Sequence, residues 1–129
     1  MSNPLDAWLG AIDAKGAGPL EELIADDAVF HSPVVFTPQK GKAATVKYLT
    51  AANAVLNNCS FRYVRQWSAA NSAALEFLTT VDGIEVDGAD FITWGADGKI
   101  TEFKVMLRPL KAINIVLQRM GEELAKTAG

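Results

Sequence analysis

Few side chains of this 129-residue chain have the type needed for acid, base or nucleophilic chemistry. There is one histidine, His31, and one cysteine, Cys59, so a zinc site of Cys and His ligands and an internal disulfide are both excluded within one chain. No second histidine can activate Cys59, which we interpret as a small structural side chain. Glycine motifs that bind phosphate are absent from the sequence, and we expect neither a cofactor nor a metal. Proton chemistry therefore has to depend mainly on carboxyl groups.

Asp90 stands out among these carboxyl groups because it interrupts an apolar pattern. From Ile84 to Trp94 the even positions are apolar or glycine except Asp90. Residues two apart on a strand share a face, so Asp90 is predicted on the apolar face, where poor solvation raises the pKa of a carboxyl. Such a group can act as a general base or as a neutral hydrogen-bond donor. Two other interpretations stay open: Asp90 accepts backbone N–H groups beside Gly88, or a slip of one residue turns it to water.

Two turn signals predict which residues surround Asp90. Asp82-Gly83 and Asp97-Gly98 are typical of two-residue hairpin turns. With these turns Asp90 faces Leu75 on the preceding strand and Val105 on the following strand. We predict an apolar ligand pocket, a common form of small-molecule site, that is lined by ten residues: Trp8, Phe30, Ser32, Leu49, Tyr63, Leu75, Phe77, Ile92, Phe103 and Val105.

His31 is the second candidate for a catalytic role because imidazole titrates near neutral pH. It stands between Phe30 and Ser32, and alternation along a strand points it away from the face that these two share. A structural role for this lone histidine stays open. The aromatic residues of the predicted pocket could equally be ordinary core side chains.

Helical spacing of apolar residues dominates the chain before residue 60. The first predicted helix ends at Gly16 and Gly18 and turns four residues inward: Leu5, Trp8, Leu9 and Ile12. A short helix follows from Pro19 and is stopped by the acidic segment 25–27. We then expect a short strand over residues 28–32, which Pro33 ends. A polar turn over residues 38–42 follows and leads to a helix with Val46, Leu49 and Leu56 inward.

The pattern becomes extended after residue 60. Alternation then predicts long antiparallel strands over 61–67, 75–81, 84–94 and 99–108, with Tyr63 and Trp67 on one face. The C-terminal helix opens at Pro109 and is predicted to bury one seam: Leu110, Ile113, Leu117, Met120 and Leu124.

Composition narrows the class of protein. The chain is 50% hydrophobic and 21% charged, which is enough apolar material for one core, and we expect a single domain over residues 1–129. The net charge of −3 and the scattered basic residues argue against a nucleic-acid partner. The N-terminus lacks a basic, apolar signal pattern, and no segment approaches the roughly 20 apolar residues that span a bilayer. We therefore expect a cytoplasmic protein without a membrane partner.

Three segments together carry a resemblance to a known family. They are LIADDAVFHSP at 23–33, PQKGKAATVKYL at 38–49 and GADFITWGADGKITEF at 88–103. With the order of elements above, the chain resembles the nuclear transport factor 2-like superfamily, in particular its SnoaL-like polyketide cyclase and ketosteroid isomerase branches. The resemblance implies a cone-shaped α+β fold, with N-terminal helices packed on a curved antiparallel sheet and a C-terminal helix.

The resemblance also carries expectations for the site. Ser32 stands where those isomerases have the aspartate that shuttles the proton, and Trp8 stands where they have a phenol donor. Asp90 corresponds to their oxyanion-hole aspartic acid, a group kept neutral by its apolar surroundings.

Two functional hypotheses follow. The first is a protein that binds a small hydrophobic molecule and acts as a cofactor-free isomerase, cyclase, dehydratase or hydrolase through Asp90. The second is a non-catalytic module of the same fold that binds a ligand or dimerises. We expect a homodimer in either case.

Overall fold

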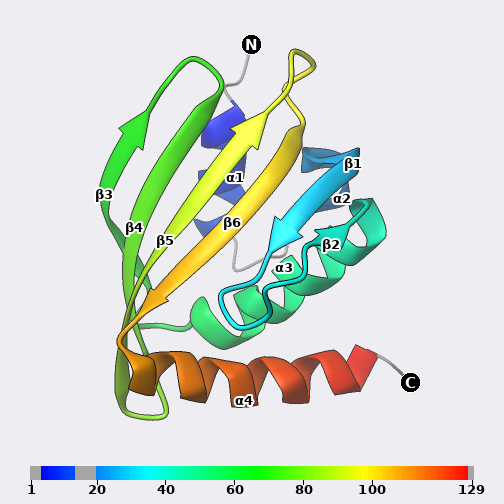
Figure 1. Ribbon diagram of the computed structural model, residues 1–129. Helices are drawn as coiled ribbons and strands as arrows, with labels where there is room; N and C mark the ends of the chain where they lie inside the picture. Colours follow the sequence, from blue (N-terminus) through cyan, green and yellow to red (C-terminus); the bar gives the residue numbers. More distant parts are fainter. Residues whose placement is uncertain (1–3, 14–19, 128–129) are drawn as a thin grey trace.

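A curved sheet forms the frame of the molecule (Figure 1). In the computed structural model, which describes residues 4–13 and 20–127, six strands lie in the order β2-β1-β6-β5-β4-β3. Their bounds are β1 Ile24–His31, β2 Gln39–Lys40, β3 Arg62–Ser68, β4 Ser72–Val81, β5 Ile84–Trp94 and β6 Ile100–Arg108. β1 and β6 pair in parallel, and all other neighbours are antiparallel.

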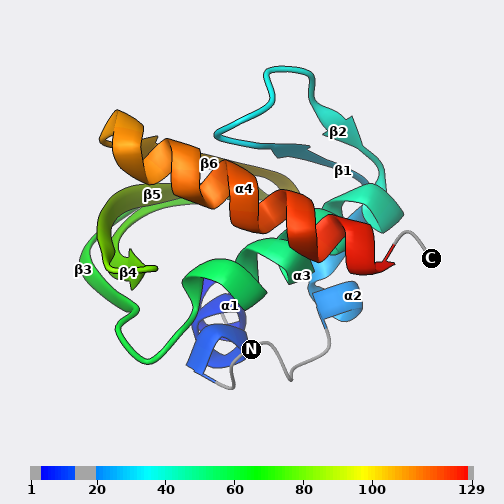
Figure 2. The ribbon, with the colours of Figure 1, turned by 90° about the horizontal axis from the view of Figure 1, so that it is seen from below.

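The helices lie against this sheet as the expected fold requires. They are α1 Pro4–Asp13, α2 Leu20–Leu23, α3 Lys42–Leu56 and α4 Leu110–Thr127. α1 and α3 lie on the concave side, and α4 runs across one end of the sheet beside α3 (Figure 2). Leu5 and Trp8 of α1 are buried as predicted, whereas the predicted helix end at Gly16 and Gly18 and the restart at Pro19 lie outside the described residues. The α+β fold with a curved, open sheet is confirmed.

The register around Asp90 is the predicted one. Asp82 and Gly83 both have positive φ, 52° and 80°, as a type I′ hairpin turn requires, and Asp90 pairs with Leu75 and Val105. The second turn is longer than expected, because the Gly95 N–H bonds to the carbonyl of Lys99. A register shift between Thr93 and Trp94 compensates for the extra residue, so the pairing beyond it is unchanged.

β1 is longer than the sequence indicates. The acidic segment was expected to stop the short helix and to precede a strand over 28–32, but the strand runs through it from Ile24 to His31. A register irregularity between Ile24 and Val29 explains the difference, because it leaves Asp26 and Asp27 exposed while the chain stays extended. The expected polar turn over 38–42 contains the two-residue strand β2.

A bulge in β3 reverses the predicted face of one aromatic residue. The register shifts between Tyr63 and Arg65, so that Tyr63 pairs with Phe77 on the inner face and Trp67 pairs with Ala74 on the outer face. Trp67 is consequently 56% exposed. The prediction that Tyr63 and Trp67 share a face is wrong.

The buried seam of α4 is also displaced from the predicted one. Ala112, Val116 and Met120 are buried, whereas Leu110 and Leu117 are exposed. Residues four apart line the buried stripe, which lies beside the larger leucines that the sequence pattern favoured. Met120 alone among the fully buried residues belongs to the predicted seam, with Ile113 and Leu124 half-buried.

Candidate functional site

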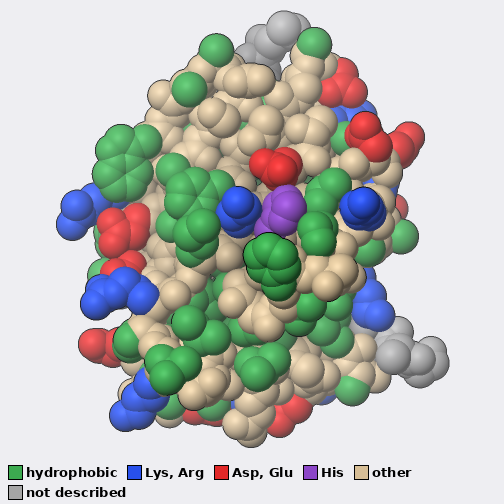
Figure 3. Space-filling model, viewed as in Figure 1, with side chains coloured by type: hydrophobic (Ala, Val, Ile, Leu, Met, Phe, Trp, Pro, Cys, Tyr) green, Lys and Arg blue, Asp and Glu red, His purple; other side chains and the backbone are tan. Residues whose placement is uncertain are grey.

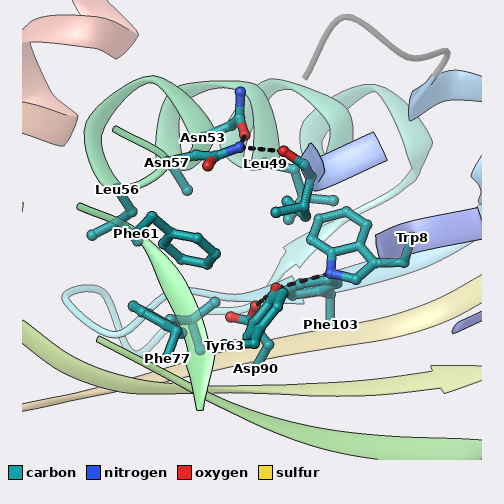
Figure 4. A pocket seen from close by; sticks show the side chains of 13 residues that line it. Trp8, Leu49, Asn53, Leu56, Asn57, Phe61, Tyr63, Phe77, Asp90 and Phe103 are labelled. Atoms are coloured by element: carbon teal, nitrogen blue, oxygen red, sulfur yellow. Dashed lines mark hydrogen bonds between the residues drawn. The ribbon is translucent and has the colours of Figure 1, made fainter. Parts of the chain in front are cut away.

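A small cavity lies between the concave face of the sheet and helices α1 and α3 (Figure 4). Its volume is about 40 Å³, room for about three water molecules at the roughly 10–15 Å³ that each needs. Apolar and aromatic side chains form most of its wall. The lining residues are Trp8, Ile12, Leu49, Ala52, Asn53, Leu56, Asn57, Phe61, Tyr63, Phe77, Asp90, Phe103 and Val105.

Asp90 is the ionisable carboxyl group of this cavity. Strand β5 turns it to the concave face, where the residue is 6% exposed. Among the described residues it has no ion pair, so no positive charge offsets the loss of water. Burial raises the pKa of Asp90 to about 7, although a hydrogen bond from Tyr63 acts in the opposite direction. Both protonation states are therefore populated near neutral pH.

Three polar side chains form a hydrogen-bonded chain that ends at this carboxyl. Trp8 Nε1 donates to Tyr63 Oη at 3.0 Å, and Tyr63 Oη donates to Asp90 Oδ2 at 2.6 Å. The dashed lines in Figure 4 follow this path from α1 through β3 to β5. Burial, followed by the negative charge of Asp90, raises the pKa of Tyr63, which keeps the phenol protonated and able to donate.

The second oxygen of Asp90 is available to a ligand. Oδ1 has no hydrogen-bond partner among the described residues. Every enclosed side-chain nitrogen or oxygen in that part of the chain has a partner, so Oδ1 must keep some accessible surface. Asp90 lines the cavity, and we conclude that this surface faces it.

Aromatic rings hold the cavity in shape. Trp8 packs on Phe103 with ring centroids 4.8 Å apart, and Phe61 stacks on Phe77 at 5.1 Å. Phe77 lies directly over Gly88, its partner in the sheet, and a Cβ atom at Gly88 would collide with the ring. The absence of a side chain at Gly88 therefore sets the position of Phe77.

Helix α3 adds residues that the sequence did not single out for the site. Asn53 and Asn57 line the cavity, and the Asn57 amide donates to Asn53 Oδ1 at 2.8 Å and to the Ile12 carbonyl of α1 at 2.9 Å. The signal was their spacing from Leu49: Asn53 lies four residues on, on the same stripe of α3, and Asn57 follows at the same interval as the residue that caps the helix. The half-buried amides connect α3 to α1 at the cavity wall.

The structure places seven of the residues singled out in the sequence around the cavity: Asp90, Trp8, Leu49, Tyr63, Phe77, Phe103 and Val105. Phe30, Leu75 and Ile92 are not among its lining residues, because their side chains are enclosed in the core. Phe30, for example, stacks between Tyr48 and Phe103.

His31 and Ser32 lie apart from Asp90, at the edge where β1 leaves β6. His31 points to the outer face, as alternation predicts, and its Nε2 is 3.2 Å from Glu102 Oε2. Ser32 Oγ accepts the N–H of Val34 at 3.2 Å. Both residues border a separate depression, which meets the Asp90 cavity only through their common wall residue, Val105. The structure therefore does not bring His31 or Ser32 together with Asp90.

Two further properties of the described residues bear on the class of protein. They contain no cluster of three or more His, Cys, Asp or Glu side chains arranged to hold a metal ion. No helix in that part of the chain is long and apolar enough to cross a membrane.

The fold and the cavity define a class, an α+β domain with a buried carboxyl between a curved sheet and its helices. The chain belongs to the SnoaL-like domain family, whose model matches residues 5–103, and thus to the nuclear transport factor 2-like superfamily. No protein with a curated description matches it.

Solved structures support this placement. A steroid delta-isomerase from Pseudomonas aeruginosa is 33% identical, with a TM-score of 0.90 over 97% of this chain and 91% of that chain. An uncharacterized protein with a cystatin-like fold from Silicibacter pomeroyi is 24% identical, with a TM-score of 0.89 over 99% and 89%. An NTF2-like protein of unknown function from Mesorhizobium loti is 20% identical, with a TM-score of 0.70 over 82% and 88%. The last two show the fold alone.

Proposed function

We propose that the protein binds a small hydrophobic molecule with a carbonyl or hydroxyl group in the Asp90 cavity, and that Asp90 moves a proton in a cofactor-free reaction. The reaction types are isomerisation, cyclisation, dehydration and hydrolysis. The observation that carries this proposal is the carboxyl itself: one oxygen is held by Tyr63 and the other faces the cavity.

The protonation of Asp90 suits both parts of the proposal. With a pKa of about 7, the neutral acid can donate to a ligand oxygen and the carboxylate can accept a proton at the same ambient pH. The similarity to a steroid delta-isomerase is further support. His31 and Ser32 lie outside the cavity, so a reaction in it depends on Asp90 and on groups of the ligand.

The small cavity volume restricts how a ligand enters. A benzene-sized ligand fills a cavity of about 150 Å³, whereas this one has about 40 Å³. A ring-sized ligand therefore requires its walls to move. The Asn57–Ile12 hydrogen bond crosses from α3 to α1 at the wall, and we expect it to lengthen when a ligand enters.

A pair of isosteric probes tests the proposal. Acetophenone presents a carbonyl oxygen, and α-methylstyrene has a CH₂ group in its place. At pH 5.5, where Asp90 is neutral, we expect NMR titration to show about two- to tenfold tighter binding of acetophenone, the value of one neutral hydrogen bond. The preference should disappear at pH 8.5, because the ionised carboxyl cannot donate.

Two variants complete this test. Asp90→Leu should remove the preference at pH 5.5, whereas Asp87→Asn, on the outer face of the same strand, should leave it intact. Equal affinities of the wild-type protein for both probes at pH 5.5 would overturn the proposal. Ligand binding without turnover of any ketone or ester screened would assign the protein to the non-catalytic hypothesis.

We also propose that the chain forms a homodimer through the outer face of the sheet. Trp67, Phe91 and Met106 are exposed there, and Figure 3 shows hydrophobic side chains between charged ones on this face. A two-fold axis through such a face would bury the same apolar side chains of both copies. Sedimentation at micromolar concentration should give the mass of a dimer, and Phe91→Glu should give a monomer. A wild-type monomer would contradict the proposal.

A cytoplasmic location without nucleic-acid or membrane partners belongs to the same proposal. Its support is the net charge of −3 and the lack of a membrane-crossing helix among the described residues. Cell fractionation should recover the protein in the cytosolic fraction. Recovery with membranes or nucleic acid would contradict this part.

A further inference from the structure

The hydrogen-bonded chain that ends at Asp90 has a fixed direction. The indole N–H of Trp8 can only donate, so the oxygen of Tyr63 must accept at that contact. A phenol oxygen has one proton and accepts close to the plane of its ring. Because Trp8 occupies the accepting side, the Tyr63 proton is left to point at Oδ2 of Asp90, 2.6 Å away.

This direction determines which oxygen of Asp90 can hold the acid proton. A proton on Oδ2 would meet the proton of Tyr63 across a short contact. Turning the Tyr63 proton away would bring it against the N–H of Trp8. Oδ1 has no partner among the described residues and faces the cavity, so a proton there meets no such conflict.

We propose that Trp8 and Tyr63 donate in one fixed direction, an arrangement called the relay below, and that this keeps the proton of neutral Asp90 on Oδ1, the oxygen exposed to the ligand. Trp8 and Tyr63 are thus positioning residues. Tyr63 acts directly on the carboxyl, and Trp8 acts through Tyr63. The inference deepens the proposed function, and its consequence for ligand binding rests on that function. The relay itself can be tested without any ligand.

The test measures the pKa of Asp90 by carbon-detected NMR in ligand-free protein. Tyr63→Phe removes a hydrogen bond to the carboxylate and should raise the pKa of Asp90 by about one unit. Trp8→Phe makes Tyr63 a weaker donor, and the hydroxyl proton of Tyr63 can then point either toward or away from Asp90. This substitution should raise the same pKa by about 0.3 of a unit, since a hydrogen-bonded neighbour strengthens the next bond by roughly 10–30%. In the double variant, Trp8→Phe should add nothing to the effect of Tyr63→Phe.

The sign of the Trp8→Phe effect separates the relay from a purely structural role. Trp8 is a buried residue, and loosened packing would admit water and lower the pKa of Asp90. A lowered or unchanged pKa in Trp8→Phe, or additive effects in the double variant, would overturn the relay. Tyr48→Phe is the matched control. It removes only the hydroxyl of a tyrosine whose ring stacks on Phe30 and does not line the cavity, and it should leave the pKa of Asp90 unchanged.

A second experiment follows the relay to the ligand. In Asp90→Asn, donation from Tyr63 should hold the amide oxygen at the former Oδ2 position and turn the NH₂ group to the cavity. The variant should therefore prefer acetophenone over α-methylstyrene equally at pH 5.5 and pH 8.5, and adding Tyr63→Phe should reduce that preference at least twofold. An unchanged preference in the double variant would overturn the relay. If the wild-type protein shows no preference at pH 5.5, the proposed function fails, and the ligand-free pKa series still decides the relay.

Discussion

Two aspartates of β5 that stand three residues apart have opposite surroundings. Asp87 is on the outer face, where Arg108 lies 3.1 Å from its Oδ2 and its side chain is 26% exposed. Asp90 is on the inner face, where a neutral phenol replaces the cation and the residue is 6% exposed. One strand thus carries both an ordinary ion-paired carboxylate and a carboxyl that changes protonation near neutral pH.

Two further carboxylates of the outer face, Glu76 and Glu102, show that the difference belongs to the two faces of the sheet. Glu76 pairs with Arg65 at 3.1 Å and Glu102 with His31 at 3.2 Å, each across neighbouring strands. On the inner face a cation would also have to give up its water, and this desolvation cost can equal or exceed the energy of its attraction to Asp90. A neutral donor such as Tyr63 orients the carboxyl without neutralising it, and this leaves the proton free to move.

The burial of Asp90 should affect the free energy of unfolding most strongly, by making it depend on pH. Below about pH 4 Asp90 is neutral in both the folded and the unfolded chain. Between about pH 4 and pH 7 it is ionised only in the unfolded chain, and above about pH 7 it is ionised in both. Rising pH therefore destabilises the fold by about 4 kcal/mol between these limits. Urea unfolding at several pH values should show this loss in the wild-type protein and not in Asp90→Asn.

Asp87→Asn is the control, because it changes the same residue type on the same strand. Its free energy of unfolding should keep the wild-type loss between pH 4 and 7. If Asp90→Asn and the wild-type protein have parallel pH profiles, Asp90 is solvated, and the contrast between the two faces is wrong.

The sequence was sufficient to predict the face and the neighbours of Asp90, since both follow from alternation and turn chemistry. It was insufficient wherever one extra residue entered a strand. The bulge after Tyr63 turned Trp67 outward, and the irregularity in β1 let Asp26 and Asp27 stay in a strand. Bulges depend on how a strand fits its neighbours in the sheet, which periodicity within a single strand does not record.

The site was predictable only in part for a similar reason. Parity identified Tyr63, Phe77 and Phe103 as inner-face residues, but it holds no information on distances between elements. The contact from Trp8 to Tyr63 joins α1 to β3 across 55 positions of the chain, and it follows from how the helix packs. The residues predicted to line the pocket therefore included Leu75, whose side chain is enclosed in the core and does not reach the cavity.

An intermediate effect is expected at Gly88, which lies on the inner face between Asp87 and Asp90. A methyl group there collides with the ring of Phe77 and with a methyl group of Leu107. Gly88→Ala should therefore destabilise the fold by about 1–3 kcal/mol through overpacking. The displaced Phe77 should also weaken binding of both probes equally. Urea unfolding and NMR titration measure the two effects.

Gly121 of α4 supplies the matched control. A Cβ atom there meets nothing within 4 Å, and Gly121→Ala in an exposed helix position should stabilise the fold by about 0.5–1 kcal/mol. The two glycine substitutions should thus have opposite signs. A stable Gly88→Ala protein with unchanged probe affinity would show that Phe77 can move without affecting the cavity.

The smallest effect is expected on the outer face, at the Arg65–Glu76 pair. The Arg65 side chain is 68% exposed, and water and salt screen such pairs, so Glu76→Gln should cost between about 0 and 1 kcal/mol at low salt. The difference should vanish near 1 M salt, where the screening length is about 3 Å. Unfolding of the wild-type protein and the variant at two salt concentrations measures it. A loss above about 2 kcal/mol that persists in salt would mean that the pair is shielded from water in solution. A second copy seated on the outer face would provide that shielding, so the same result would favour the homodimer and confine the contrast between Asp87 and Asp90 to the monomer.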